Sequence, residues 1–197
     1  MGNINYVYEN LKLLMDRIEK TCEKISRNPH DITIVAVTKK IPSETIRLAL
    51  DAGITEIGEN KVQELLSKYN ALNRVNWHFI GHLQTNKVKY IIDKVSLIHS
   101  VDSIHLASEI NRRALSIGKT ADILIQVNVA GEESKYGIKP EECNEMINLL
   151  KNFKGIRVKG LMTIAPFVDN PNDIRWVFAN LFKLFIDIKS KNTDNIY

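Results

Sequence analysis

The stretch Ile32-Thr33-Ile34-Val35-Ala36-Val37-Thr38-Lys39-Lys40-Ile41-Pro42-Ser43 decides the fold. Its first six residues, 32–37, are apolar or β-branched, which is typical of a strand buried on both faces in a parallel sheet. Pro42 then ends the strand, and Ser43 caps a helix whose apolar positions are Ile46, Ala49 and Leu50. The sequence therefore predicts a buried strand followed by an amphipathic helix.

Lys39 is expected at the carboxyl end of this strand, where α/β folds place their chemistry. Side-chain alternation puts it on one face with Val35 and Val37 and turns Lys40 to the other. A lysine that is partly desolvated there has a lowered pKa, and its neutral amine can attack a carbonyl group. A solvent-facing ammonium group at a strand end is an equally good interpretation of the position alone.

The rest of the chain alternates between the two periodicities. An N-terminal helix over about 3–26 carries an apolar stripe at Ile4, Val7, Leu11, Leu14, Ile18, Cys22 and Ile25. We expect this helix to pack on the domain core, with a coiled-coil dimer as the alternative. Strands are predicted at 32–38, 54–58, 76–80, 95–99, 122–129 and 156–162. Helices are predicted at 43–52, 60–72, 85–93, 103–117, 140–152 and 171–190.

Strict alternation with short connections predicts an α/β fold with a parallel sheet and right-handed crossovers. Small or polar residues follow every predicted strand: Lys39, Glu59-Asn60, Gly81-His82, Ser100, Asn128 and Thr163. Strand ends of this kind would converge on one mouth, so we expect a TIM-type (β/α) barrel rather than an open sheet. A single domain over 1–197 is predicted, with the barrel starting at about residue 31 and ending after its sixth strand–helix unit.

Composition excludes several classes of function. The net charge of +4 is modest and its lysines are scattered among acids, which argues against a nucleic-acid groove. No apolar run approaches membrane-spanning length, so we expect no membrane association. Cys22 and Cys143 lie far apart inside helical patterns, which predicts reduced structural thiols in a cytoplasmic protein.

Common cofactor and metal motifs are missing. The chain has neither a phosphate-loop motif nor the dinucleotide GxGxxG pattern. His78 and His82 are four residues apart but fall on a predicted strand, so we expect no helical zinc site and no metal. Asn60 suits the N-cap of the helix after the second strand, with Gln63 as its reciprocal partner.

Five blocks in order, taken together, resemble the pyridoxal phosphate homeostasis family, also called the proline synthase co-transcribed homologues. The blocks are 36–39 (AVTK), 57–64 (IGENKVQE), 77–87 (WHFIGHLQTNK), 133–137 (ESKYG) and 160–164 (GLMTI). The family looks like the alanine racemase barrel domain standing alone. The resemblance implies a cytoplasmic protein that binds pyridoxal 5′-phosphate (PLP) through a lysine Schiff base and regulates vitamin B6 and amino-acid balance without established turnover.

By position in the family pattern, Lys39 is the PLP-binding lysine. The resemblance makes Asn60, Met162, His82 and Ser100 further cofactor contacts on neighbouring strand ends. It implies no catalytic residue and no metal, PLP-dependent apoenzymes as possible recipients of the cofactor, and a monomer or weak dimer. In the family two more strands hold the cofactor phosphate. This sequence ends without them at Asn195-Ile196-Tyr197, so we expect weak PLP binding by the chain as written.

Three other functions compete with a PLP carrier. A PLP-dependent amino-acid racemase or decarboxylase could use the same lysine, but it needs a base on each face of the cofactor. A Schiff-base aldolase without PLP would need only the lysine. A scaffold or RNA-associated protein rests only on the mild positive charge.

Overall fold

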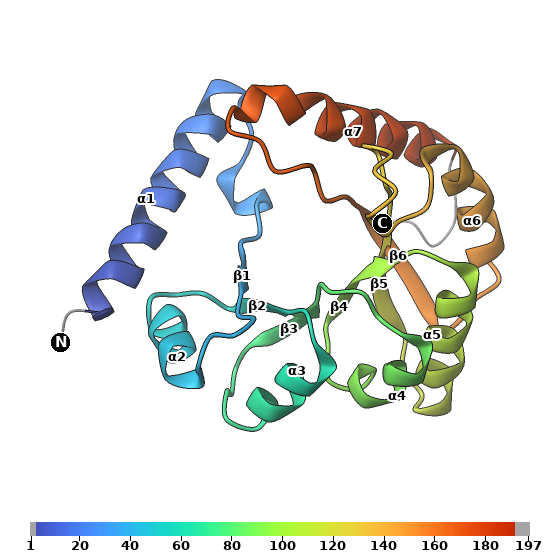
Figure 1. Cartoon of the computed structure of the whole chain (residues 1–197), viewed down its shortest axis with the longest axis horizontal. Helices are drawn as coiled ribbons and strands as arrows, with labels where there is room; N and C mark the ends of the chain where they lie inside the picture. The colour runs from blue at the N-terminus through green and yellow to red at the C-terminus, as the bar shows by residue number, and fades with distance from the viewer. Residues whose placement is uncertain (1–2, 192–197) are drawn as a thin grey trace. The chain divides into compact units, whose positions relative to one another are not determined.

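The computed structural model describes residues 3–191, with side chains from residue 6 onward. Helices and strands alternate along this chain as the sequence predicts (Figure 1). The chain divides after His78 into two compact units, each of which is described by itself.

The first unit contains three helices and three strands in its described part. Its elements are α1 (Asn3–Lys24), a 3-10 turn (Pro29–Asp31), β1 (Val35–Val37), α2 (Ser43–Asp51), β2 (Glu56–Glu59), α3 (Val62–Tyr69) and β3 (Asn76–Phe79), whose last residue opens the second unit. Strands β1 and β2 pair in parallel, with Val35 opposite Glu56 and Val37 opposite Gly58. Strand β3 begins where Asn76 N donates to Thr55 O at 2.9 Å.

Strand β1 is shorter and more exposed than the sequence predicts. It covers three residues instead of seven, and the Val37 side chain is 52% exposed, so the expected burial on both faces is wrong. A cavity of about 710 Å³ between α1 and the segments 30–34 and 52–56 lies just before this strand, and Ile32 and Ile34, which line it, are only half-buried. An apolar run reports only that a segment can be buried, not whether a neighbour covers it.

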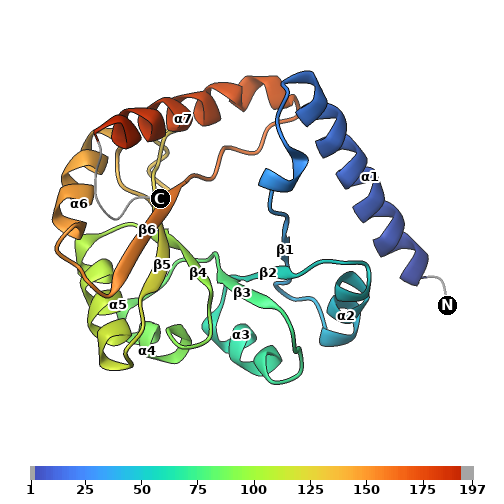
Figure 2. The ribbon, with the colours of Figure 1, turned by 180° about the vertical axis from the view of Figure 1, so that it is seen from behind.

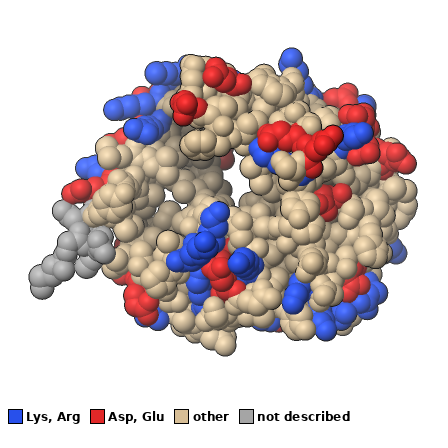
Figure 3. Space-filling view, viewed as in Figure 1, with Lys and Arg blue, Asp and Glu red and all other residues tan. Residues whose placement is uncertain are grey.

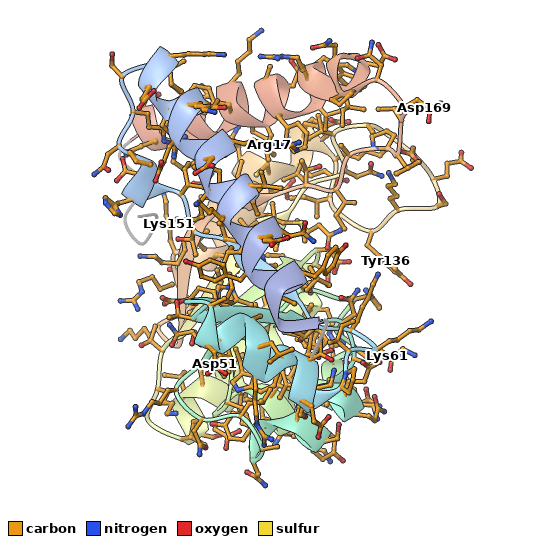
Figure 4. All side chains as sticks on the ribbon, turned by 90° about the vertical axis from the view of Figure 1, so that its left-hand side faces the viewer. Arg17, Asp51, Lys61, Tyr136, Lys151 and Asp169 are labelled. Carbon is orange, nitrogen blue, oxygen red and sulfur yellow. The ribbon has the colours of Figure 1, made fainter. Side chains whose placement is uncertain are left out.

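Helix α1 is long because no glycine or proline interrupts residues 3–24. Figure 4 shows it crossing α2, with Arg17 on α1 and Asp51 on α2 marking the two helices, and the two are in contact. Cys22 of the predicted stripe is buried, whereas Leu14 and Ile25 are exposed, so the stripe is only partly covered. The side chain of Ile4 lies outside the described residues.

Two predicted helix caps are wrong. Ser43 is the first residue of α2, and the N-cap is Pro42, which has no side-chain cap. The N-cap of α3 is Lys61, not Asn60, and its side chain makes no capping hydrogen bond. The chain stays extended at Lys61, because β2 continues to the buried Glu59 before the helix can begin.

The second unit carries β4 (Leu97–Val101), β5 (Ala121–Gln126) and β6 (Ile156–Met162) as parallel neighbours in chain order. Its helices are α4 (Val88–Ile91), α5 (Ile104–Ser116), α6 (Cys143–Leu150) and α7 (Arg175–Ser190), with 3-10 turns at Thr85–Lys87, Pro140–Glu142 and Pro171–Ile174. Figure 2 shows the three strands side by side, and α5 contacts β5 and β6.

The core of the second unit forms where α5 covers the sheet. Fully buried aliphatic side chains come from both layers: Ile98, Ile123, Ile125, Ala107, Ile110 and Ala114. Helix α5 starts at the N-cap Ser103, whose hydroxyl oxygen accepts from Leu106 N. Proline opens the turns before α6 and α7, where its fixed φ and missing N–H are tolerated.

Both cysteines are free and buried, Cys22 in α1 and Cys143 in α6, which confirms their prediction as reduced structural thiols. Across residues 3–191, no helix combines the length and the apolar character needed to span a membrane.

Candidate functional site

Lys39 lies in a turn directly after β1, one residue beyond Thr38. Its side chain is exposed, so of the two interpretations of this position the solvent-facing ammonium group is the one that the structure shows. The turn also ends the strand alternation that would separate Lys39 from Lys40, because Lys40 takes a left-handed φ of 61°. Among the described residues the Lys39 amine has no ion-pair or hydrogen-bond partner, which leaves it accessible to a small molecule.

Asn60 follows β2 just as Lys39 follows β1. Val37 of β1 pairs with Gly58 of β2; Lys39 stands two residues after Val37, and Asn60 stands two residues after Gly58. Asn60 Oδ1 is buried and has no hydrogen-bond partner among the described residues, and the same is true of Glu59 Oε2. Unpaired buried acceptors are uncommon and costly in proteins, and a donor from a bound molecule would satisfy them.

Charged side chains surround the exposed part of this region. Figure 3 shows basic side chains interspersed with acidic ones over β2 of the first unit. Lys39, Lys40 and Lys61 are exposed, and Figure 4 shows Lys61 extending away from the ribbon. Exposed lysines favour the approach of an anionic small molecule.

Under this surface lies a buried polar network. Lys68 Nζ donates to Glu59 Oε1 at 2.6 Å and to Thr38 O at 2.8 Å. Thr38 Oγ1 donates to the same Glu59 oxygen at 2.7 Å. Glu64 Oε2 accepts from Lys40 N at 2.7 Å, and this hydrogen bond is the main reason that the pKa of Glu64 lies below its ordinary value.

In the second unit, His82 is part of a second group of side chains. Its ring stacks on Tyr136, with ring centroids 3.9 Å apart and planes inclined by 13°. Its Nδ1 lies 3.8 Å from Asp102 Oδ2. Burial raises the pKa of Asp102 above its ordinary value, and the charge of His82 opposes that rise.

The other two predicted contacts occupy strands of the same unit. Ser100, in β4, is buried, and its hydroxyl donates to Gly81 O at 2.5 Å, next to His82. Met162 ends β6 half-buried, and its backbone carbonyl accepts from Val127 N at 2.8 Å. The Ser100 hydroxyl thus holds in place the loop that carries His82.

Comparison with known proteins places the chain in a family. Residues 13–194 match the family described as alanine racemase, N-terminal domain. The chain is 44% identical over 178 residues to the pyridoxal phosphate homeostasis protein of Aquifex aeolicus, covering 89% of this chain and 78% of that protein. This chain belongs to the pyridoxal phosphate homeostasis protein family.

Solved structures agree with this family membership. An unknown protein from Bifidobacterium adolescentis is 32% identical, with a TM-score of 0.90 over 99% of this chain and 85% of that chain. PipY of Synechococcus elongatus, whose structure has PLP bound, is 27% identical, with a TM-score of 0.77 over 91% of this chain and 84% of that chain. The predicted α/β fold, resembling the PLP-binding domain of alanine racemase, is therefore confirmed.

Two groups in this homeostasis-family chain have the chemistry needed to bind PLP. The accessible amine of Lys39 can react with an aldehyde, and the unpaired Asn60 Oδ1 can accept from a hydroxyl group or a protonated ring nitrogen. Both groups belong to the first unit. The roles of Asn60, His82, Ser100 and Met162 as cofactor contacts stay predictions.

Sequence reasoning missed the network of Thr38, Glu59 and Lys68, and also the partners of His82. One signal was available: Glu64 and Lys68 stand four residues apart in the predicted helix, the spacing of an i,i+4 ion pair. The contacts of Lys68 with Thr38 and Glu59 join segments up to 30 residues apart, and no local pattern reports them.

Proposed function

We propose that this protein binds PLP as a Schiff base on Lys39 and serves PLP homeostasis in the cytoplasm, without turning over a substrate. The observation that carries the proposal is the accessible amine of Lys39 on the turn after β1, in a chain of this family. PLP supplies an aldehyde carbon: the Lys39 nitrogen bonds to it, and the aldehyde oxygen leaves as water with two protons from the neutral amine.

The surrounding residues of the first unit support a reversible attachment. The turn holds the Lys39 amine outside the hydrophobic core, where water can reach it and hydrolyse the bond. Asn60 offers a buried acceptor at the end of the neighbouring strand. Reversible binding with water access suits a protein that takes up and releases its cofactor, and PLP-dependent apoenzymes are the recipients that we propose.

Replacing Lys39 tests the attachment. In Lys39→Ala the absorption band of the PLP Schiff base should disappear while far-UV circular dichroism stays unchanged, because the side chain is exposed and its amine has no hydrogen-bond or ion-pair partner among the described residues. Borohydride reduction of the wild type followed by peptide mass spectrometry should place the cofactor on Lys39. Lys40→Ala is the matched control and should keep the band. A reduced adduct on Lys40 would refute the assignment.

A racemase is the second candidate, because the matching family is named for alanine racemase. A racemase needs a base on each face of the cofactor and a site that excludes water. The exposed position of Lys39 does not favour such a site. Incubation with each L-amino acid, followed by chiral chromatography, should show no D-isomer. Formation of a D-isomer by the wild type but not by Lys39→Ala would make the protein an enzyme.

A further inference from the structure

The turn that carries Lys39 rests on an unusual group of buried polar residues. Thr38 is 4% exposed, Lys68 is 8% exposed and Glu59 is fully buried. Lysine and glutamate are almost never buried to this extent unless they are paired. Here they pair at 2.6 Å, and the hydroxyl of Thr38 completes the group.

Every donor of the Lys68 ammonium has an acceptor. Its three neighbours are Glu59 Oε1 at 2.6 Å, Thr38 O at 2.8 Å and Glu64 Oε2 at 3.5 Å. The Thr38 carbonyl belongs to the peptide bond that leads into Lys39, and it also accepts from Ile41 N at 3.0 Å. Lys68 therefore fixes the peptide plane immediately before Lys39.

Glu64 fixes the other side of the same residue. Its Oε2 accepts from the backbone N–H of Lys40 at 2.7 Å. Lys40 has a φ of 61°, a left-handed backbone conformation that residues other than glycine rarely adopt. Two residues of α3 thus hold the peptides on both sides of Lys39 and impose a turn that the chain would not favour by itself.

Stability alone does not explain this arrangement. A buried ion pair is commonly no more stabilising than apolar side chains of the same volume. Glu59 also leaves Oε2 without a partner among the described residues, although a purely structural pair would gain from satisfying it. What the polar group provides, and apolar side chains could not, is directed hydrogen bonds to the backbone around Lys39.

We propose that Lys68 and Glu64, with Glu59 as the buried counter-ion of Lys68, are positioning residues that present the amine of Lys39, and not that of Lys40, to the aldehyde. This inference rests on the proposed attachment of PLP to Lys39. The three residues do not touch the aldehyde themselves; they act through the backbone of residues 38–40.

The decisive variant removes the hydrogen bonds without leaving a buried charge. In Lys68→Met/Glu59→Leu both members of the pair become apolar, so the fold should be retained, whereas Lys68→Met alone would strand Glu59. Lys191→Met is the matched control, because it removes an exposed lysine from an i,i+4 pair with Asp187 in α7. Circular dichroism and thermal melting report whether each variant is folded.

Two labelling reactions compare the neighbouring lysines. The first is PLP with borohydride, and the second is formaldehyde with cyanoborohydride, which labels amines without any cofactor site. Peptide mass spectrometry gives the ratio of Lys39 to Lys40 labelling. For PLP the ratio should fall about tenfold in the double variant, because small displacements of a reacting group cost large factors in rate. The formaldehyde ratio should fall as well, and Lys191→Met should match the wild type in both reactions.

The outcomes separate this inference from the proposed function. Wild-type protein that carries PLP elsewhere than on Lys39 refutes the proposed function. Wild-type labelling on Lys39, together with an unchanged ratio in the folded double variant, overturns the positioning role alone. Should the double variant not fold, Glu64→Ala decides: it removes the acceptor for Lys40 N and keeps the buried pair, and a ratio equal to that of the wild type then overturns the proposal.

Discussion

At the residue scale, neighbouring side chains of this protein differ sharply in environment. Thr38 is buried and hydrogen-bonded while Lys39, the next residue, is exposed. The proposed attachment of PLP to Lys39 would therefore take place at the surface, next to a buried and hydrogen-bonded residue. Cys143 and Asp102 are in the opposite environment from Lys39: both are largely removed from water, and burial raises the pKa of each above its ordinary value.

Cys143 should be inert in the native protein. Burial raises the pKa of its thiol to about 11, so the thiolate, which is the reactive form, is about a thousandth of the population at pH 8. Iodoacetamide at pH 8 should leave Cys143 unlabelled in the native protein and label both Cys143 and Cys22 in urea. Rapid native labelling of Cys143, measured by mass spectrometry, would contradict the burial.

Asp102 should make stability depend on pH. Burial raises its folded-state pKa above the unfolded value of about 3.9, so the folded state binds the proton more tightly. This contribution is present at pH values below the unfolded pKa and is lost as pH rises through the folded pKa. Asp102→Asn should remove the effect, so the variant should gain stability relative to the wild type between pH 4 and pH 7. Urea unfolding of both proteins at pH 4 and at pH 7 measures this change. The same difference in unfolding free energy between variant and wild type at the two pH values would refute the prediction.

At the element scale, the loop after β5 folds back on its own strand. Gln126 O accepts from Ile138 N at 2.9 Å, and the Asn128 side chain donates to the Glu132 carbonyl at 2.9 Å. Gly137 makes this return possible, because it has a φ of 124° and a Cβ there would lie 2.7 Å from Asn128 N.

Gly137→Ala should therefore destabilise the protein by about 3 kcal/mol, through backbone strain and this collision. Gly131→Ala is the control: its φ is 69°, but a Cβ there meets nothing within 4 Å, so only the left-handed conformation is penalised. That variant should lose about 1 kcal/mol. Chemical denaturation measures both, and equal losses would show that the contact with Asn128 relaxes freely.

At the scale of the whole molecule, the described chain exposes apolar side chains that favour association. Helix α7 exposes Trp176, Phe178, Phe182 and Ile186, and a groove of about 320 Å³ between α7 and β5–β6 is lined by several aromatic rings. Exposed apolar patches of this kind promote association. The predicted monomer or weak dimer depends on whether this surface is covered.

Phe178→Gln/Phe182→Gln should lower the fluorescence of bound anilinonaphthalene sulfonate and reduce concentration-dependent association in sedimentation velocity. Both rings are more than half exposed, at 52% and 62%, so little packing is lost and thermal melting should hardly change. Leu150→Gln is the contrasting control. Leu150 lies in the core of the second unit and is only 3% exposed, so a polar side chain there should unfold the protein. Unchanged association in the double variant would show that another surface is responsible.

The sequence by itself determined the order and type of the elements. Periodicity placed β6 at 156–162 without error, and it set most helix ends to within a few residues, because local hydrophobic patterns and proline report local structure. Only the tertiary structure decided what surrounds each segment. Val37 and Lys39 are exposed in the folded chain, and the pairing of Lys68 with Glu59 and Thr38 joins α3 to β2 and to the residue that follows β1. Burial and hydrogen bonding between distant segments arise from packing, and packing has no local signature in the chain.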